Sequence, residues 1–184
     1  LSETKMEVLQ SQMNPHFIYN ALNSIQSLVT SDKKDEAVYY IGTFSRLLRQ
    51  VLDQSENNVI SLEKELQTLE LYIGLESLRL NMTPNYVVHI ANGIQANDEK
   101  IPPLTLQPVI ENALWHGLGK KEGEKKITLS ISANIGWIIC CIEDNGIGRI
   151  GAAAFKSPNI IQHQSKAIDI TTKRLIDCND NNLL

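Results

Sequence analysis

Apolar and polar positions alternate with two different periods along the chain. In roughly the first 80 residues, apolar side chains recur every three or four positions, the spacing of an α-helix with a buried face. From about residue 86 onward they recur every second position in short β-branched runs, the spacing of strands. The pattern predicts three helices, then strands and helices around a mixed sheet: an α segment followed by an α+β segment.

The first predicted helix carries apolar residues on two sides. Phe17 lies on one stripe, while Leu22, Ile25 and Val29 lie roughly on the opposite side. A helix of this kind needs packing partners on both faces, as the helices of a bundle have. The pattern therefore favours association between two copies of the chain.

Two breaks divide the helical part. TSDKKDEA indicates a break and a new helix capped by Ser31 or Asp32, which continues through VYYIGTFSRLLRQVL. After a loop, Ser61 is predicted to cap a third helix, LEKELQTLELYIGLESLRL. Glu63 and Glu65 are expected to interact favourably with the positive end of this helix.

The second half is predicted to form a mixed sheet with helices. Its β-branched runs are bounded by turn residues, and ANIG between two of them fits a tight hairpin. The predicted elements are strands at 86–91, 126–133 and 136–144, a helix at 106–116 and a final helix within 165–178.

Composition narrows the class of protein. The chain has 184 residues, 42% hydrophobic and 21% charged, which is typical of a globular protein. Its net charge of −4 lacks the basic excess that non-specific nucleic-acid binding requires, so we expect no nucleic-acid partner. No apolar run approaches the roughly 20 residues that span a bilayer. Because the chain begins at Leu1 within a helical pattern, we expect a fragment whose membrane segments, if any, lie outside it.

CIEDNGIGR places a carboxylate and two glycines at the end of an apolar strand. A buried Asp144 would need a hydrogen-bond donor, and the exocyclic amine of adenine is one. Gly146 and Gly148 would let the backbone turn tightly and approach a ligand. Taken alone, the motif also fits a turn that binds nothing.

PVIENALWHG places polar residues on a predicted helix. The amide oxygen of Asn112 could complete the coordination of Mg²⁺ held by nucleotide phosphates, because magnesium prefers oxygen ligands and takes few from protein. Glu111 and His116 lie on the same helix. Taken alone, these side chains also fit a helix whose polar face meets water.

Together with MNPHFIYNALN, these motifs resemble those of the LytS-like sensor histidine kinases. The dimerisation segment of that family carries N-P-H-F-x-[FY]-N-x-L-N, which residues 14–23 match completely. Its ATP-binding domain, of the gyrase/chaperone/kinase/MutL (GHKL or Bergerat) type, carries L-Q-P-x-x-E-N-A and D-N-G-x-G. LQPVIENA (106–113) and DNGIG (144–148) match both, so the resemblance covers nearly the whole chain.

The resemblance implies an enzyme that transfers the γ-phosphoryl group of ATP to a histidine. His16 would be the phosphoacceptor, since a neutral imidazole is an adequate nucleophile near pH 7. Asn20, one helical turn later, would orient the ring or the phosphoryl group. If a general base is used, Glu111 is the candidate.

The resemblance also implies a nucleotide site, with ATP and Mg²⁺ as cofactors. Asn112 would bind the metal, Asp144 would accept a hydrogen bond from adenine, and His116 would lie near the nucleotide. Gly146 and Gly148 would form the hinge into a lid that closes over ATP.

The family's organisation implies two segments. Residues 1–55 would form a helical hairpin that carries the phosphoacceptor and dimerises as a four-helix bundle. Residues 56–184 would form the ATP-binding domain, a two-layer α/β sandwich with a mixed sheet. The implied partners are a second copy of the chain and the receiver domain of a response regulator. The implied location is the cytoplasmic portion of a bacterial inner-membrane sensor.

Pro15, directly before His16, has two interpretations. A helix that continues through ETKMEVLQSQM would bend at Pro15, because the proline ring clashes with the preceding turn. Alternatively, Asn14 caps a helix that begins at Pro15. The good helix-forming residues upstream favour the bent helix, and either geometry lifts the imidazole out of regular packing.

Several features bear on whether the chain is an active kinase. Hydrolytic members of the superfamily carry a glutamate one turn before the asparagine, and Pro108 in that place disfavours an ATPase. Trp115 replaces a common lysine that could meet a phosphate, and Ala167 replaces an expected glycine. The chain also stops at Leu184, before further expected strands. Trp115 and Ala167 support a rival hypothesis, a degenerate dimeric module that does not phosphorylate, whereas the intact His16 and Asn112 speak against it.

Overall fold

The computed structural model describes residues 15–134 and 137–148. Of Pro15 and His16 only the backbone is described, and the predicted helix before them lies outside the described residues. Whether the first helix bends or begins at Pro15 therefore stays a prediction. The expected ATP lid, Ala167 and the predicted final helix also lie outside the described residues.

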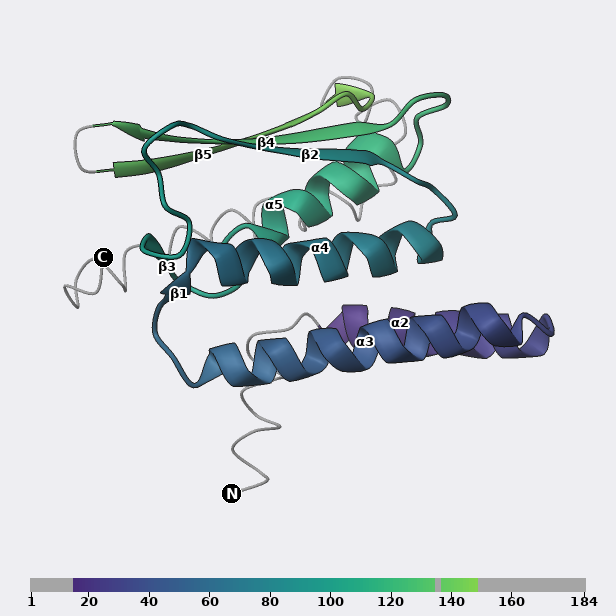
Figure 1. The fold of residues 1–184 in the computed structure, drawn as a ribbon. Coiled ribbons are helices and arrows are strands. Elements are labelled where there is room, and N and C mark those ends of the chain that lie inside the picture. Colours follow the sequence, from purple (N-terminus) through teal and green to yellow (C-terminus); the bar gives the residue numbers. More distant parts are fainter. Residues whose placement is uncertain (1–14, 135–136, 149–184) are drawn as a thin grey trace.

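Helices precede the main sheet, in agreement with the predicted α and then α+β order. The elements are α2 (Pro15–Thr30), α3 (Lys34–Ser55), β1 (Ile60–Ser61), α4 (Leu62–Arg79), β2 (Asn85–Ile90), β3 (Lys100–Ile101), α5 (Gln107–Asn112), the π-helix η1 (Ala113–Leu118), β4 (Lys126–Asn134) and β5 (Trp137–Asp144). In Figure 1, α4 and α5 lie between the three-stranded sheet and the hairpin of α2 and α3. No described helix is both long and apolar enough to cross a bilayer.

The turn between α2 and α3 differs from the prediction of a cap at Ser31 or Asp32. Asp32 adopts a left-handed φ of 57°, and the N–H of Lys33 donates to the Leu28 carbonyl at 2.9 Å. This is the geometry that ends a helix, usually with glycine at the left-handed position. Because Asp32 is used to close α2, the N-cap of α3 falls on Lys33, whose side chain makes no capping bond.

Helix α4 begins at the predicted cap, but Glu65 in its first turn binds a loop elsewhere in the chain. Ser61 is the N-cap, and its Oγ accepts the Lys64 N–H at 3.3 Å. Glu65, however, is buried, and its carboxylate accepts the backbone N–H groups of Leu104 (2.8 Å) and Leu106 (2.9 Å). The glutamate therefore fixes the loop that leads into α5.

The main sheet is mixed and has the order β2-β4-β5. Strand β2 pairs parallel with β4, placing Tyr86 opposite Ile127, whereas β5 pairs antiparallel with β4. Asn134 lies opposite Trp137, which confirms the predicted hairpin, although residues 135–136 between them are not described. A second antiparallel pair, β1 with β3, is only two residues long and was not predicted.

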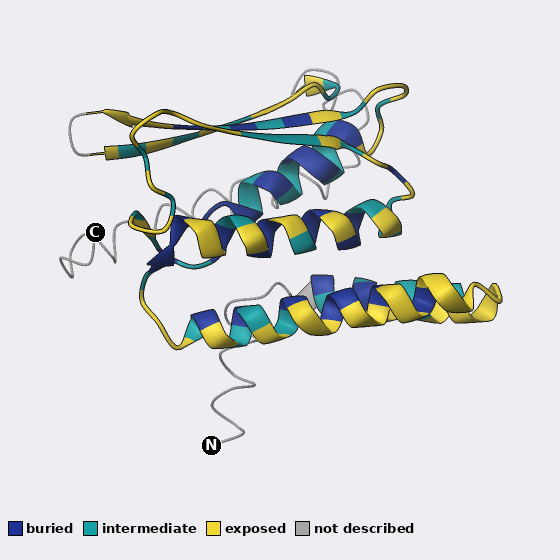
Figure 2. Ribbon diagram, in the orientation of Figure 1, coloured by how far each residue is buried: buried dark blue, intermediate teal, exposed yellow. Residues whose placement is uncertain are grey.

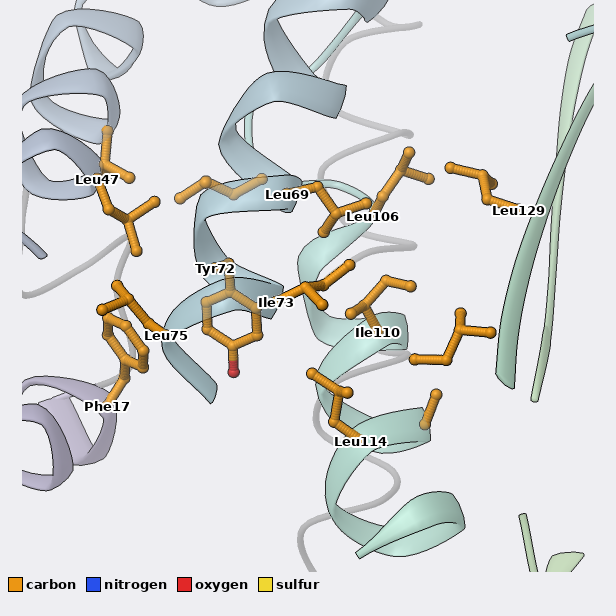
Figure 3. Close-up of a cluster of buried hydrophobic side chains, with 14 of the residues drawn as sticks. Phe17, Leu47, Leu69, Tyr72, Ile73, Leu75, Leu106, Ile110, Leu114 and Leu129 are labelled. Atoms are coloured by element: carbon orange, nitrogen blue, oxygen red, sulfur yellow. The ribbon is translucent and has the colours of Figure 1, made fainter. Parts of the chain in front are cut away.

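One apolar core runs through all the layers. Figure 3 shows Phe17 of α2 and Leu47 of α3 on one side of α4, and Ile110 of α5 and Leu129 of β4 on the other. Tyr72 of α4 lies between these groups, and all five side chains are almost completely buried. The helical hairpin and the sheet half of the molecule are therefore joined by continuous packing.

Candidate functional site

The turn after β5 packs against the C-terminal end of η1. The N–H of Gly146 donates to Oδ1 of Asp144 at 2.9 Å, and the N–H of Ile147 donates to the Gly117 carbonyl at 3.1 Å. The D-N-G-x-G turn and the helix of the L-Q-P-x-x-E-N-A motif are thus neighbours, although a long stretch of sequence separates them. We refer to Gly117, Asp144 and Gly146 as the glycine corner.

Two glycines permit the close approach at this corner. A Cβ atom on Gly117 would collide with Oδ1 of Asp144, and one on Gly146 would collide with the backbone of Gly117. Gly148 has a φ of 68°, a conformation that costs glycine little. Sequence reasoning missed Gly117, although its place directly after His116 in the helical motif was a usable signal.

Asp144 is exposed, which corrects the expectation of a buried carboxylate. It is the last residue of β5, and the Gly146 N–H supplies a hydrogen bond to its carboxylate. Because Asp144 is exposed, its carboxylate does not require a hydrogen-bond donor from a ligand. Its position at the corner, open to solvent, still allows its carboxylate to accept one.

Asn145 ties the turn to the loop before β4. Its side-chain oxygen accepts the Lys126 N–H at 2.8 Å, and its amide group donates to the Glu124 carbonyl at 3.2 Å. The ammonium of Lys121 donates to the Asn145 carbonyl at 2.6 Å. The asparagine of the motif thus fixes the turn that carries Asp144.

The helix predicted at 106–116 is present, but its second half is a π-helix. Asn112 is the last residue of α5, and η1 follows directly. Glu111, Asn112 and His116 are all partly exposed. A π-helix is rare and is often found at functional sites, because it widens the turn and redirects side chains.

The residues present fit a magnesium ion that is held mainly by phosphates. Within the described ranges, no group of three or more His, Cys, Asp or Glu side chains could hold a metal. A site of Asn112 plus phosphate oxygens needs no such group, because Mg²⁺ is often bound by one or two protein oxygens together with phosphates and water.

His16 and Asn20 belong to the first two turns of α2, a helix that lies on the opposite side of α4 from the three-stranded sheet (Figure 1). Phe17, the residue after His16, is buried against Phe44 and Tyr72, with ring centroids 6.0 and 5.1 Å apart. The structure thus brings the Asn112 helix to the Asp144 turn. Helix α4 lies between the hairpin of α2 and α3 and the three-stranded sheet (Figure 1).

Trp115 is directed toward α4. Its indole N–H donates to Oε2 of Glu76 at 2.5 Å, and the Arg79 guanidinium lies 5.0 Å from the centre of its ring. Arg79 also pairs with Glu76 at 2.6 Å. The side chain at position 115 is therefore engaged with α4.

Comparisons with known proteins identify relatives. A family model described as histidine kinase matches residues 4–83. The chain is 33% identical over 149 residues to the sensor protein LytS of Staphylococcus epidermidis, covering 80% of this chain and 24% of that protein. It is 31% identical over 147 residues to the sensor histidine kinase YpdA of Escherichia coli, covering 80% and 25%. It is also 31% identical over 148 residues to LytS of Bacillus subtilis, covering 80% and 24%.

The chain spans about a quarter of the length of the curated relatives that it matches. The alignments cover most of this chain, and three motifs occur in the family's order. The chain therefore belongs to the LytS-like sensor histidine kinases.

Proposed function

We propose that the chain is the core of an ATP-dependent protein-histidine kinase in a two-component system. Residues 1–55 would be the dimerisation and phosphoacceptor segment, and residues 56–184 the GHKL-type ATP-binding domain. The observation that carries the proposal is the packing of the Asp144 turn against the helix that bears Asn112 and His116. Membership of a family whose relatives are named sensor histidine kinases supports the same conclusion.

The corner has the chemistry that a bound nucleotide needs. Asp144 would accept a hydrogen bond from the adenine amine, and His116 would lie near the nucleotide. Asn112 would hold Mg²⁺, which would supply positive charge against the phosphates. Gly148 would act, with Gly146, as the hinge into the lid.

In the transfer step, an imidazole nitrogen of His16 would attack the γ-phosphorus while the bond to the leaving ADP breaks. Asn20 would orient the acceptor, and Glu111 is the candidate for a general base. Because α4 lies between the hairpin and the three-stranded sheet, we propose that His16 receives the group from the partner subunit or after the hairpin moves relative to α4. An aspartate on a response regulator would then receive it.

A dimer through the hairpin is supported by an apolar surface on α2 and α3. Figure 2 shows that much of the hairpin surface is exposed. Each large apolar residue on the outside of the hairpin is between 43% and 69% exposed. These residues are Tyr19, Leu22, Val29, Val38, Tyr39 and Ile41. We propose that two copies bury this surface in a four-helix bundle. We further propose that the chain acts in the cytoplasmic portion of a membrane-associated bacterial sensor.

Labelling with γ-labelled ATP and Mg²⁺ tests the kinase. The wild type should acquire acid-labile, alkali-stable label, and His16→Gln should abolish it. Asn112→Ala should lower both ATP binding and labelling, whereas His89→Gln, at an exposed histidine on β2, should leave both unchanged. Label that survives His16→Gln would rule out the assigned acceptor. ATP binding without label would favour the rival degenerate module.

A further inference from the structure

Glu76 carries a completely buried carboxylate near the end of α4. Arg79, one turn later, donates to it through both Nε and a terminal nitrogen, the latter at 2.6 Å. Burial lowers the pKa of Arg79, but the hydrogen bond and charge of Glu76 outweigh this and raise it overall. A buried carboxylate is strongly destabilising once it loses its partners, so the groups around Glu76 are held in place.

Trp115 joins this ion pair from a different element. Its N–H donates to the same Glu76 oxygen that Arg79 contacts, and its ring lies under the Arg79 guanidinium. Each of the three side chains thus contacts the other two, through an ion pair, a charge-assisted hydrogen bond and a cation–π contact. We call Glu76, Arg79 and Trp115 the α4–η1 cluster.

The cluster holds the middle of the π-helix. Trp115 lies between Asn112, the last residue of α5, and Gly117, which meets Asp144 at the glycine corner. A π-turn has a less favourable backbone geometry than an α-turn and depends more on tertiary contacts for its shape. Fixing Trp115 against α4 therefore fixes the residues on both sides of it.

We propose that the α4–η1 cluster positions the nucleotide site: Glu76 and Arg79, acting through Trp115, set the orientation of η1 relative to Asp144. This inference rests on the proposed function, since it assigns a role toward ATP. It makes Trp115 a positioning residue that does not contact a phosphate, so the absence of lysine at this place does not disable the site.

Trp115→Phe tests the positioning role. Phenylalanine keeps an aromatic ring under Arg79 but removes the N–H that Glu76 accepts, a bond to a charged group. We expect ATP·Mg²⁺ to bind about tenfold more weakly, measured by titration calorimetry on fully folded protein. Amide hydrogen exchange in residues 113–118 should become faster at the same time. Unchanged exchange there would overturn the proposal.

Trp115→Lys separates positioning from phosphate contact. If the side chain at 115 is directed at Glu76, the lysine will pair with that carboxylate and ATP will gain no affinity relative to AMP. If position 115 instead reaches the phosphates, the added charge will strengthen ATP binding tenfold or more while AMP binding stays the same. That second outcome would overturn the proposal.

Gln54→Ala provides the matched control. Gln54 of α3 donates to Thr68 of α4 at 2.7 Å, a buried polar contact on the hairpin side of α4. Its loss should lower the melting temperature without changing ATP affinity or exchange in 113–118. If the control changes them as much as Trp115→Phe does, the cluster has only a structural role. Should the wild type bind no ATP, the proposed function fails, and the exchange data still decide whether the cluster holds η1.

Discussion

Glu65 organises the loop in front of the candidate site. Its side chain is 1% exposed, and its two oxygens accept the backbone N–H groups of Leu104 and Leu106. Leu104 has a φ of 58°, a conformation uncommon for leucine that the surrounding contacts must hold. Since α5 begins directly after this loop, Glu65 supports the helix that ends at Asn112.

Glu65→Gln is predicted to destabilise the protein by about 1–3 kcal/mol, because a glutamine offers one acceptor oxygen where two backbone donors are buried. Urea denaturation measures the change. Glu63→Gln, at an exposed acid in the same helical turn, is the control and should stay within about 0.5 kcal/mol of the wild type. Equal effects in the two variants would contradict the role given to Glu65.

The thiol of Cys140 makes the free energy of unfolding depend on pH in the alkaline range. Burial, and next the charge of Glu65, raise the pKa of the Cys140 thiol to about 11. The folded chain therefore holds this proton more tightly than the unfolded chain, whose thiol pKa is about 8.5. The resulting stabilisation is fully present below about pH 8.5 and is lost as pH rises toward 11.

Urea midpoints measured between pH 8 and 10 test this dependence. In Cys140→Ala the urea midpoint should fall less steeply with rising pH than in the wild type. Cys141→Ala, on the exposed side of the same strand, should keep the wild-type decrease. Burial also raises the pKa values of Tyr40 and Tyr72, so a further decline at higher pH should occur in every variant. An unchanged profile for Cys140→Ala would contradict the assignment.

At the scale of elements, two glycines on helices are predicted to respond in opposite directions to alanine. Gly117→Ala places a methyl group against Asp144 and should destabilise the protein by about 1–3 kcal/mol. Gly74→Ala, on the exposed face of α4 with no atom nearby, should stabilise it by about 0.5–1 kcal/mol. Thermal unfolding measures both, and shifts of the same sign would contradict the tight contact at the corner.

Elements with a clear period were predictable from the sequence. The helices α3 and α4, the mixed sheet and the Ser61 cap agree with the alternation of apolar residues and with local capping chemistry. The two-residue strands β1 and β3 are too short to carry a period. The π-helix was missed because its apolar spacing is close to that of an α-helix over so few residues.

Side chains whose partners are distant in the sequence could not be predicted. Glu65 accepts from backbone groups 39 and 41 residues away, and Glu76 accepts from Trp115, 39 residues away. Nothing local distinguishes these acids from solvent-exposed ones on the same helix. The family resemblance assigned Asn112 and Asp144 to one nucleotide site, so it implied that the Asn112 helix and the Asp144 turn are neighbours. The closeness of their contact depends on Gly117, whose role is visible only in the folded structure.

For the molecule as a whole, the exposed apolar surface of the hairpin predicts the oligomeric state. Leu22 is 52% exposed, and Leu22→Glu would bury a charge in the proposed bundle. We expect the dimer dissociation constant to rise by roughly 100-fold, measured by sedimentation equilibrium. Ile139→Glu, at an exposed isoleucine on β5, should leave it unchanged. A wild type that is monomeric at high concentration would contradict the prediction.

Helix α4 packs on two sides, because Tyr72 and Leu75 meet the hairpin while Leu69 and Ile73 meet α5 (Figure 3). Removing the hairpin would uncover a strip of this helix that has no other cover in the described chain. We therefore expect one shared melting transition in calorimetry, and we expect residues 56–184 made alone to aggregate. A displacement of the hairpin should therefore be transmitted through α4 to α5 and η1, which carry the candidate nucleotide site. The hairpin packs against one side of the eighteen residues of α4, and α5 and Trp115 of η1 pack against the same helix.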